Sequence, residues 1–282
     1  MNWAKIAKIL LKINYMLAAI ACALAIALYA CKSFAKDIKV MAIDTGIGKH
    51  HMLDGYVQYD GTIDYKPELG HGTHVAGIII YGNKAVNAVQ LYKEAVCHNV
   101  KLYACNFYSE TQVSPALTPG VRMRNCVKKA IDEKMDIINI SAGGEGFSQP
   151  EYDLIKEYTN HGGIVVAAAG NENKELKKHP FYPASYGVGY KIDGAIDAFE
   201  PIKGVYAVSS VNDKYEYADG SNRDLQSIPE KGINIFSTLP NNRYGYMTGT
   251  SQAAPAFLHQ ILMYMCKHME EKHGNSTNSN GD

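Results

Sequence analysis

The sequence predicts an α/β domain in which a doubly wound, mostly parallel sheet carries helices on both faces. Short apolar runs alternate along the chain with longer segments of helical spacing, which is the pattern of βαβ units. The runs at 136–140 and 164–168 are apolar almost throughout, as expected of strands buried on both faces. In such sheets, ligands bind beyond the carboxyl ends of the strands.

The strands are predicted from apolar runs that end at polar or glycine-rich turns. We expect them at 36–43, 101–107, 136–140, 164–168, 205–211 and 233–237. Residues 241–243 are expected to form only a turn, and His50 and His51 to be solvated loop residues.

The helices are predicted from apolar residues that recur at helical spacing. Val75, Ile78 and Ile79 define the inner face of a helix over 71–81, and Val86 and Val89 suggest another over 85–96. Further helices are expected at 121–134, at 150–160, and from about 251 to 272. Gly274 is expected to end the last of these.

Composition indicates one ordinary globular domain. The chain has 282 residues, enough for one large core, with 28 basic and 28 acidic residues. This balance gives no reason to expect nucleic acid or an acidic molecule as a partner. We expect a single domain over 36–274 and a polar, disordered tail over 275–282.

Residues 1–35 are predicted to be an export segment rather than part of the fold. Three lysines precede an apolar run from 13 to 30, which is the pattern of a secretory signal. Cleavage after Ala35 is one interpretation, a lipoprotein signal with lipidated Cys31 is a second, and an uncleaved membrane anchor is a third. All three place the domain outside the cytoplasm, with membrane contact only through this segment.

Four cysteines remain beyond the export segment, and they allow three pairings. They are Cys97, Cys105, Cys126 and Cys266. Cys105 lies on a predicted strand and Cys126 on the core face of the next helix, which would let them meet. Buried free thiols fit the pattern equally well.

A small-residue turn at 249–255 runs straight into an apolar helix and carries Ser251. In the first helical turn, Ser251 would lie among unpaired N–H groups at the positive end of the helix dipole. That position suits a nucleophile whose attack creates an oxyanion. A lone serine there is more often a helix cap, so other residues must decide.

Two further stretches supply the partners that a serine nucleophile needs. Asp44 ends the first predicted strand, and His71 opens the next predicted helix. A histidine can take the proton of a serine hydroxyl, and a carboxylate can hold that histidine in the required tautomer. Asn171 follows the strand at 164–168 and could donate to an oxyanion. His71 and His74 have neither an HExxH pattern nor a third ligand, so no metal site is predicted.

These stretches closely resemble the subtilisin-like serine proteases (subtilases, peptidase S8). The resemblance rests on 40–46, 71–79, 165–173 and 249–255 in the family's order, with further matches at 137–144, 182–184 and 236–240. It implies a subtilisin-like fold and a triad of Asp44, His71 and Ser251. It also implies that Asn171 and the Ser251 N–H form the oxyanion hole.

The same resemblance places the substrate groove between two walls of small, uncharged residues. One wall is Ser141, Ala142 and Gly143, and the other contains Ala169 and Gly170. Phe181 stands where the family often has a glycine at the pocket floor. We therefore expect a shallow, neutral pocket for small or medium apolar side chains of polypeptide substrates.

The sequence departs from the family in two places. Little more than 36–39 separates the export segment from the Asp44 strand, so the domain is expected to fold without a separately encoded prodomain. The family's calcium loop is not recognisable in 81–90, so calcium cannot be placed, and the chemistry needs no cofactor.

Two hypotheses follow. The first is a secreted or membrane-tethered serine endopeptidase that works through an acyl-enzyme. The second is a catalytically inactive, subtilase-like peptide-binding module. The complete set of Asp44, His71, Ser251 and Asn171 favours the first.

Overall fold

The structure is a computed structural model that describes residues 37–58, 70–91, 93, 95–107, 118–190 and 199–277. The predicted export segment 1–35, with its two cysteines, lies outside the described residues. So do residues 108–117 and residues 278–282 of the predicted tail.

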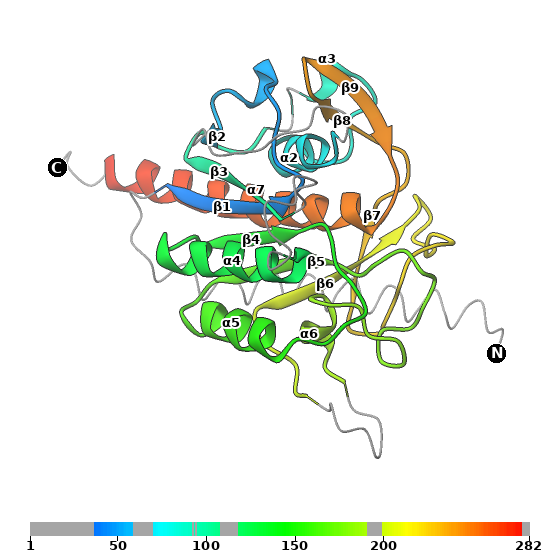
Figure 1. Cartoon of the computed structure of the whole chain (residues 1–282). Helices are drawn as coiled ribbons and strands as arrows, with labels where there is room; N and C mark the ends of the chain where they lie inside the picture. Colours follow the sequence, from blue (N-terminus) through cyan, green and yellow to red (C-terminus); the bar gives the residue numbers. More distant parts are fainter. Residues whose placement is uncertain are drawn as a thin grey trace.

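Seven parallel strands form the central sheet, in the order β2-β3-β1-β4-β5-β6-β7 (Figure 1). Their bounds are β1 Ile38–Asp44, β2 Val57–Gln58, β3 Val100–Asn106, β4 Ile137–Ile140, β5 Ile164–Ala168, β6 Val205–Val211 and β7 Ile228–Lys231. A separate antiparallel hairpin joins β8 Ile235–Leu239 to β9 Arg243–Met247. The predicted doubly wound α/β fold is confirmed.

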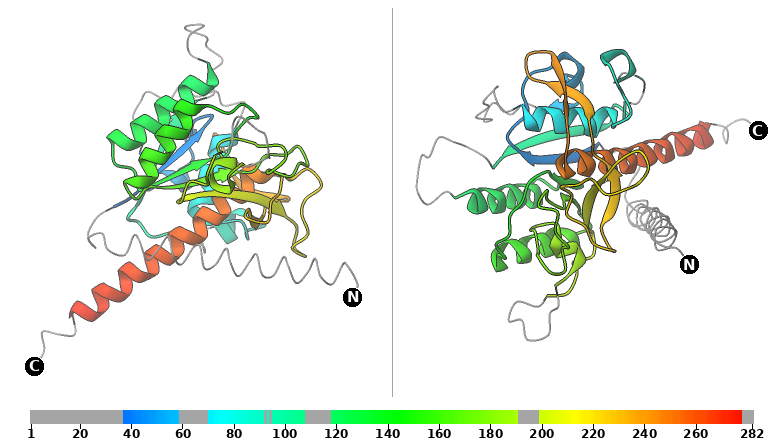
Figure 2. Two further views of the ribbon diagram at one scale, coloured as in Figure 1. Left: turned by 90° about the horizontal axis from the view of Figure 1, so that it is seen from below. Right: turned by 90° about the vertical axis from the view of Figure 1, so that its right-hand side faces the viewer.

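Helices cover both faces of the sheet, because successive side chains of each strand point to opposite faces. The helical segments are η1 His51–Leu53, α2 His71–Tyr81, α3 Ala88–Leu91, α4 Pro119–Asp132, α5 Gln149–Asn160, α6 Ser185–Val188 and α7 Thr250–Thr277. Val40 and Ala42 of β1 pack in the cluster that contains residues of α2 and α7. Met41 and Ile43 pack in the cluster that contains residues of α4 and α5. Figure 2 shows α7 on one side of the sheet and the pair α4 and α5 on the other.

The winding of the sheet reverses between β1 and β4. From β1 the chain proceeds to β2 and β3 on one side, and then crosses to β4 and β5 on the other. Ile43 pairs with Ile140, and Ile140 pairs with Ala167. The carboxyl ends of β1, β4 and β5 therefore leave the sheet side by side, at the place where doubly wound proteins bind ligands.

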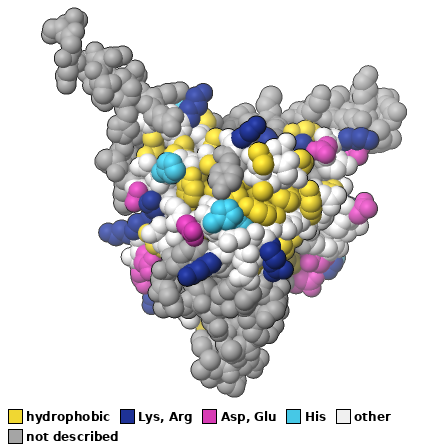
Figure 3. Space-filling view, turned by 90° about the horizontal axis from the view of Figure 1, so that it is seen from above, with side chains coloured by type: hydrophobic (Ala, Val, Ile, Leu, Met, Phe, Trp, Pro, Cys, Tyr) yellow, Lys and Arg dark blue, Asp and Glu magenta, His cyan; other side chains and the backbone are white. Residues whose placement is uncertain are grey.

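The helix predicted over 85–96 is wrong for most of its length. Among the described residues of this segment, the α-helix is the single turn α3, and Val86 and Val89 are 59% and 73% exposed. The side chains of Asn87 and Gln90 hydrogen-bond to nearby backbone N–H groups, which stabilises a local turn instead. Leu91 is the buried anchor of the segment. Figure 3 views the face that carries α3 and the β8–β9 hairpin, and it shows apolar side chains gathered there.

Three strands and one helix end also differ from the sequence-based prediction. Strands β2 and β7 were not predicted; both lie at the edges of the sheet, where β7 can accommodate Pro229. Strand β9 replaces the turn expected at 241–243 and extends to Met247. Helix α7 begins at Thr250 and continues past Gly274 to Thr277, since one glycine costs a helix only about 1 kcal/mol.

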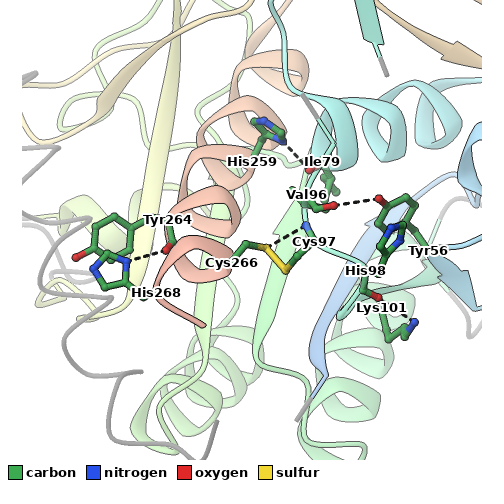
Figure 4. Close-up of a disulfide and its surroundings, with 10 residues drawn as sticks. All are labelled: Tyr56, Ile79, Val96, Cys97, His98, Lys101, His259, Tyr264, Cys266 and His268. Atoms are coloured by element: carbon green, nitrogen blue, oxygen red, sulfur yellow. Dashed lines mark hydrogen bonds between the residues drawn. A yellow bond between two sulfur atoms is a disulfide. The ribbon is translucent and has the colours of Figure 1, made fainter. Parts of the chain in front are cut away.

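The four described cysteines form two disulfides, so the free-thiol alternative is wrong. Cys105 in β3 pairs with Cys126 in α4. Cys97 pairs with Cys266 and ties the segment before β3 to α7 across 169 residues of sequence (Figure 4). Beside this bridge, the ring of His259 contacts the carbonyl of Ile79 in α2, 3.1 Å from Nδ1. The two contacts fix α7 to the segment before β3 and to α2.

Among the residues that the structure describes, no helix combines the length and apolar character needed to cross a bilayer.

Candidate active site

Asp44 and His71 form the first contact of the site. Nδ1 of His71 donates to Oδ1 of Asp44 at 2.7 Å, and the N–H of Thr45 donates to the same oxygen at 2.7 Å. The Asp44 side chain is 2% exposed and that of His71 is 30% exposed. The Asp44 charge raises the pKa of His71, against the opposing effect of desolvation. With Nδ1 protonated, Nε2 of the neutral ring is free to accept a proton.

The start of α2 can lie close to the end of β1 because Gly72 has no side chain. A Cβ atom at Gly72 would lie 2.1 Å from the carbonyl oxygen of Gly46 and 3.1 Å from Oδ1 of Asp44. The Gly72 N–H donates to Oγ1 of Thr45 at 3.0 Å. This close approach brings the first residue of α2, His71, onto the carboxylate at the strand end.

Ser251 lies in the first turn of α7 and pairs with Ser141, which directly follows β4. The Ser251 hydroxyl donates to the Ser141 carbonyl at 3.0 Å, and the Ser141 hydroxyl donates to the Ser251 carbonyl at 2.9 Å. The buried amide of Asn139 donates to the Ser141 hydroxyl at 3.0 Å. No hydrogen bond joins Ser251 to His71 among the described side chains. In proteins without bound substrate, such bonds often form only in the complex.

Asn171 is oriented by Thr250, the residue before Ser251. Its Oδ1 accepts from the Thr250 N–H at 3.0 Å and from the Thr250 hydroxyl at 3.2 Å. The same hydroxyl accepts from the Gly170 N–H at 3.1 Å. These bonds occupy Oδ1, so the Nδ2 group of the exposed Asn171 is the part of the amide that can donate to a bound molecule. The Ser251 N–H lies in the first helical turn, where such groups have no helical partner.

Phe181 fills the space between the two glycine-containing walls. A Cβ atom at Gly143 would lie 2.4 Å from the Phe181 ring, and one at Gly170 would lie 2.9 Å from it. Gly144 and Tyr182 pair through two backbone hydrogen bonds of 2.9 and 2.7 Å. Ala142 follows Ser141 in the chain on the first wall. On the second wall, Ala169 precedes Gly170 and is fully buried. The Phe181 ring therefore limits the depth of the space between the two walls.

A hollow lies against the Gly144–Tyr182 pairing, and both residues line it. It is a cavity of about 210 Å³ whose lining includes Phe107, Met123, Gly143 and Glu151. Glu151 is the first-turn acid of α5 and is 8% exposed. No local sequence pattern indicates this cavity, because its lining comes from segments that are far apart in the chain.

His74 is a buried structural residue. Its Nε2 faces the carbonyls of Ile235 at 3.0 Å and Gly245 at 3.2 Å, and so donates to them. Burial lowers the pKa of His74 to about 4, which keeps the ring neutral. No three His, Cys, Asp or Glu side chains gather closely enough to hold a metal within the described part of the chain.

Sequence reasoning missed the residues that orient the others. Thr45, Asn139 and Thr250 each hold a neighbour through a hydrogen bond. In the sequence, the only indication of a role for Thr45 and Thr250 is that they adjoin Asp44 and Ser251. Threonine beside a turn is too common for this to predict an orienting role.

A family model described as "Subtilase family" matches residues 35–257. The chain belongs to the subtilase family. Among relatives of this subtilase, the minor extracellular protease Epr of Bacillus subtilis is 33% identical over 224 residues, which cover 78% of this chain and 30% of Epr. The major intracellular serine protease of Bacillus subtilis is 32% identical over 236 residues, covering 78% of this chain and 66% of that protein. The subtilase described here thus spans about a third to two thirds of the length of these relatives.

Solved structures show the same subtilase fold. The patellamide maturation protease PatA aligns with a TM-score of 0.63 at 20% identity, covering 84% of this chain and 81% of PatA. A cold-adapted subtilisin-like serine proteinase aligns with a TM-score of 0.60 at 22% identity, covering 83% of this chain and 78% of that one.

Proposed function

We propose that this subtilase is a serine endopeptidase that cleaves polypeptides through an acyl-enzyme. The observation that carries the proposal is the 2.7 Å hydrogen bond between His71 and the buried Asp44, at the strand end next to Ser141 and its partner Ser251. This brings base, carboxylate and hydroxyl to one edge of the sheet. The named relatives are proteases, which agrees with this reading.

The proposed reaction begins when Ser251 turns its hydroxyl from the Ser141 carbonyl toward His71. Nε2 of His71 accepts the proton as Oγ attacks the peptide carbonyl, and Asp44 stabilises the resulting imidazolium. His71 then gives the proton to the leaving amine, which leaves an acyl-enzyme on Ser251. In the second half, His71 takes a proton from a water molecule as the water attacks the acyl carbonyl, and it returns the proton to Ser251 Oγ as the acid product leaves. Asn171 Nδ2 and the Ser251 N–H donate to the oxyanion in both halves of the reaction.

The proposed substrate is an extended peptide that pairs with the backbone of Ser141, Ala142 and Gly143. Extended peptides add to exposed strand edges through backbone hydrogen bonds, and pockets beside the edge select side chains. Here Ala169 and Gly170 form the opposite wall, and the Phe181 ring limits the depth between them. We propose that small or medium apolar residues are preferred directly before the cleaved bond.

We also propose that the domain works outside the cytoplasm. The two disulfides support this, because disulfides persist mainly in oxidising compartments. The related proteases carry both extracellular and intracellular names, so relationship alone does not decide the location.

The bond from Ser251 to Ser141 also fits the second hypothesis, an inactive peptide-binding module. Labelling by a fluorophosphonate probe separates the two, because the probe reacts only with an activated serine. We expect the native protein to be labelled and the Ser251→Ala variant not to be. A folded native protein that resists the probe and also fails to cleave casein would contradict the endopeptidase proposal.

A further inference from the structure

Helix α7 contains a proline close to Ser251. The helix begins at Thr250, and Pro255 lies within it. In a regular helix, the N–H of residue 255 donates to the carbonyl of Ser251, four residues earlier. Proline has no N–H, and its ring also crowds that carbonyl. The Ser251 carbonyl therefore lacks its regular helical donor and is open to a donor from another element.

The side chain of Ser141 supplies this donor. Its hydroxyl donates to the Ser251 carbonyl at 2.9 Å, although the two residues are 110 positions apart in the sequence. Ser141 directly follows β4 and is 3% exposed, so water has little access to compete for the bond. The Ser141 hydroxyl thus replaces the backbone N–H that Pro255 does not have.

Asn139 determines the direction in which the Ser141 hydroxyl donates. This residue lies in β4 and is fully buried, and its Nδ2 donates to the Ser141 hydroxyl at 3.0 Å. A hydroxyl has one proton and two lone pairs. Because Asn139 occupies a lone pair, the proton remains available for the Ser251 carbonyl. The three groups form a chain of donors that runs from the sheet to the start of α7.

The two hydrogen bonds between Ser141 and Ser251 differ in what the proposed reaction requires of them. The Ser251 hydroxyl donates to the Ser141 carbonyl at 3.0 Å, and this bond must break before the hydroxyl can turn toward His71. The bond to the Ser251 carbonyl involves only the backbone of Ser251, so it can persist through that rotation. Strand β4 pairs with β1, whose last residue, Asp44, accepts from His71. The persistent bond therefore ties the backbone of the nucleophile to the strand beside the one that holds its base.

We propose that the Ser141 hydroxyl is a positioning group for Ser251, and that it is needed because Pro255 withholds the helical N–H. It holds the Ser251 backbone in place while the Ser251 hydroxyl moves between the Ser141 carbonyl and His71. Asn139 supports this bond by directing the Ser141 proton. The catalytic consequence rests on the proposed peptidase function. Ser141 thus acts twice, through its backbone on the substrate and through its side chain on the nucleophile.

Activity provides the first test. Ser141→Ala keeps the backbone that pairs with the peptide, so it should lower kcat about 10–10²-fold with little change in KM. In the Pro255→Ala background, the N–H of residue 255 can reach the Ser251 carbonyl. Ser141→Ala should there lower kcat less than about threefold, because the lost donor has a replacement. Hydrolysis of a chromogenic peptide gives kcat, expressed per serine titrated with a fluorophosphonate probe.

A matched control removes a serine hydroxyl from another strand of the same sheet. Ser209 in β6 is fully buried, and its hydroxyl donates to that of Ser227 at 2.8 Å. Ser209→Ala should leave kcat unchanged in both backgrounds. The inference would be overturned by an unchanged kcat in Ser141→Ala, or by the same loss with and without the proline. A higher KM at constant kcat in Ser141→Ala would also refute it, because the hydroxyl would then serve substrate binding.

Unfolding separates this inference from the proposed function. Urea unfolding of the native protein, the Ser141→Ala and Pro255→Ala variants and the double variant gives the same comparison without any cleavage. Ser141→Ala should reduce the folded-to-unfolded ratio about tenfold more in the native background than in the Pro255→Ala background, which corresponds to one hydrogen bond. Equal losses in the two backgrounds would overturn the inference, whatever the native protein cleaves. Unequal losses in a native protein that resists the probe would uphold the exchange of donors and contradict the peptidase proposal.

Discussion

The proposed catalytic residues and the cavity lined by Glu151 are assembled differently. Asp44, Ser141 and Asn171 lie at or just beyond the carboxyl ends of three adjacent parallel strands, and His71 and Ser251 lie in the first turns of two helices that pack on the same face. Each lies in a short motif at the end of an element. By contrast, the cavity lined by Glu151 draws its lining from the residue after β3, from α4 and α5, and from the loops at 143–146 and 182–183. Reaction chemistry is thus locally encoded, whereas the cavity depends on packing between distant segments.

The largest effect should come from the nucleophile and its base. Ser251→Ala or His71→Ala should each lower kcat by about 10⁶-fold, and the double variant should be little worse, because the two residues act as one unit. Steady-state hydrolysis of a chromogenic peptide measures this. Near-native activity in Ser251→Ala would show that another residue is the nucleophile. The catalytic residues would then not be encoded in the local motifs named above.

Asp44 should have the next largest effect and should also change the pH dependence. Its carboxylate raises the pKa of His71, so the acid limb of the native kcat/KM profile should have its midpoint above 6.5. Activity rises with pH there, because His71 must lose its proton before it can act as a base. Asp44→Asn should lower activity by about 10⁴-fold and move the acid limb of the residual activity to lower pH. An unmoved limb would mean that Asp44 does not set the pKa of His71.

Asn171→Ala should lower kcat by about 10²–10³-fold with little change in KM, because its amide acts mainly in the transition state. The contacts from Thr250 to Oδ1 predict a smaller loss for Thr250→Val, which removes the orienting hydroxyl but not the donor. Both values come from the same kinetic assay. A higher KM with unchanged kcat in Asn171→Ala would instead assign this residue to substrate binding.

Sequence was sufficient for the five inner strands of the sheet and for the positions of the motifs, but not for the edge strands β2 and β7. Strands such as β4 and β5 are buried on both faces and read as continuous apolar runs, which have few other interpretations. It failed where tertiary contacts decide the outcome. The valines at 86 and 89 have helical spacing but face solvent. His50 was expected in solvent, yet it is 1% exposed, with its ring packed against Tyr244 of β9.

The site shows the same division. Asp44, His71 and Ser251 were predicted as a set, but the rotamer that pairs Ser251 with Ser141 could not be read from the chain. Glu151 looked like an ordinary first-turn acid of an amphipathic helix. Its burial is decided by α4 and by the aromatic residues of a later segment, including Tyr186. No local pattern carries that information.

Phe181 should have the smallest effect of the residues considered, and it concerns selectivity rather than rate. Its ring lies between Gly143 and Gly170, where it occupies space that a large substrate side chain would need. The native protein should therefore prefer alanine, valine or leucine over phenylalanine directly before the cleaved bond. One misplaced methylene in a pocket is worth about 1–3 kcal/mol, so Phe181→Gly should raise the kcat/KM ratio of phenylalanine to alanine substrates about tenfold or more. Phe181→Leu should give an intermediate ratio, since it removes only part of the ring volume. Because each ratio is taken on one enzyme preparation, partial misfolding of a variant does not disturb it. A native preference for phenylalanine, or the same ratio in all three proteins, would show that Phe181 does not limit the pocket. Side-chain selection directly before the cleaved bond would then depend on the walls at 141–143 and 169–170 alone.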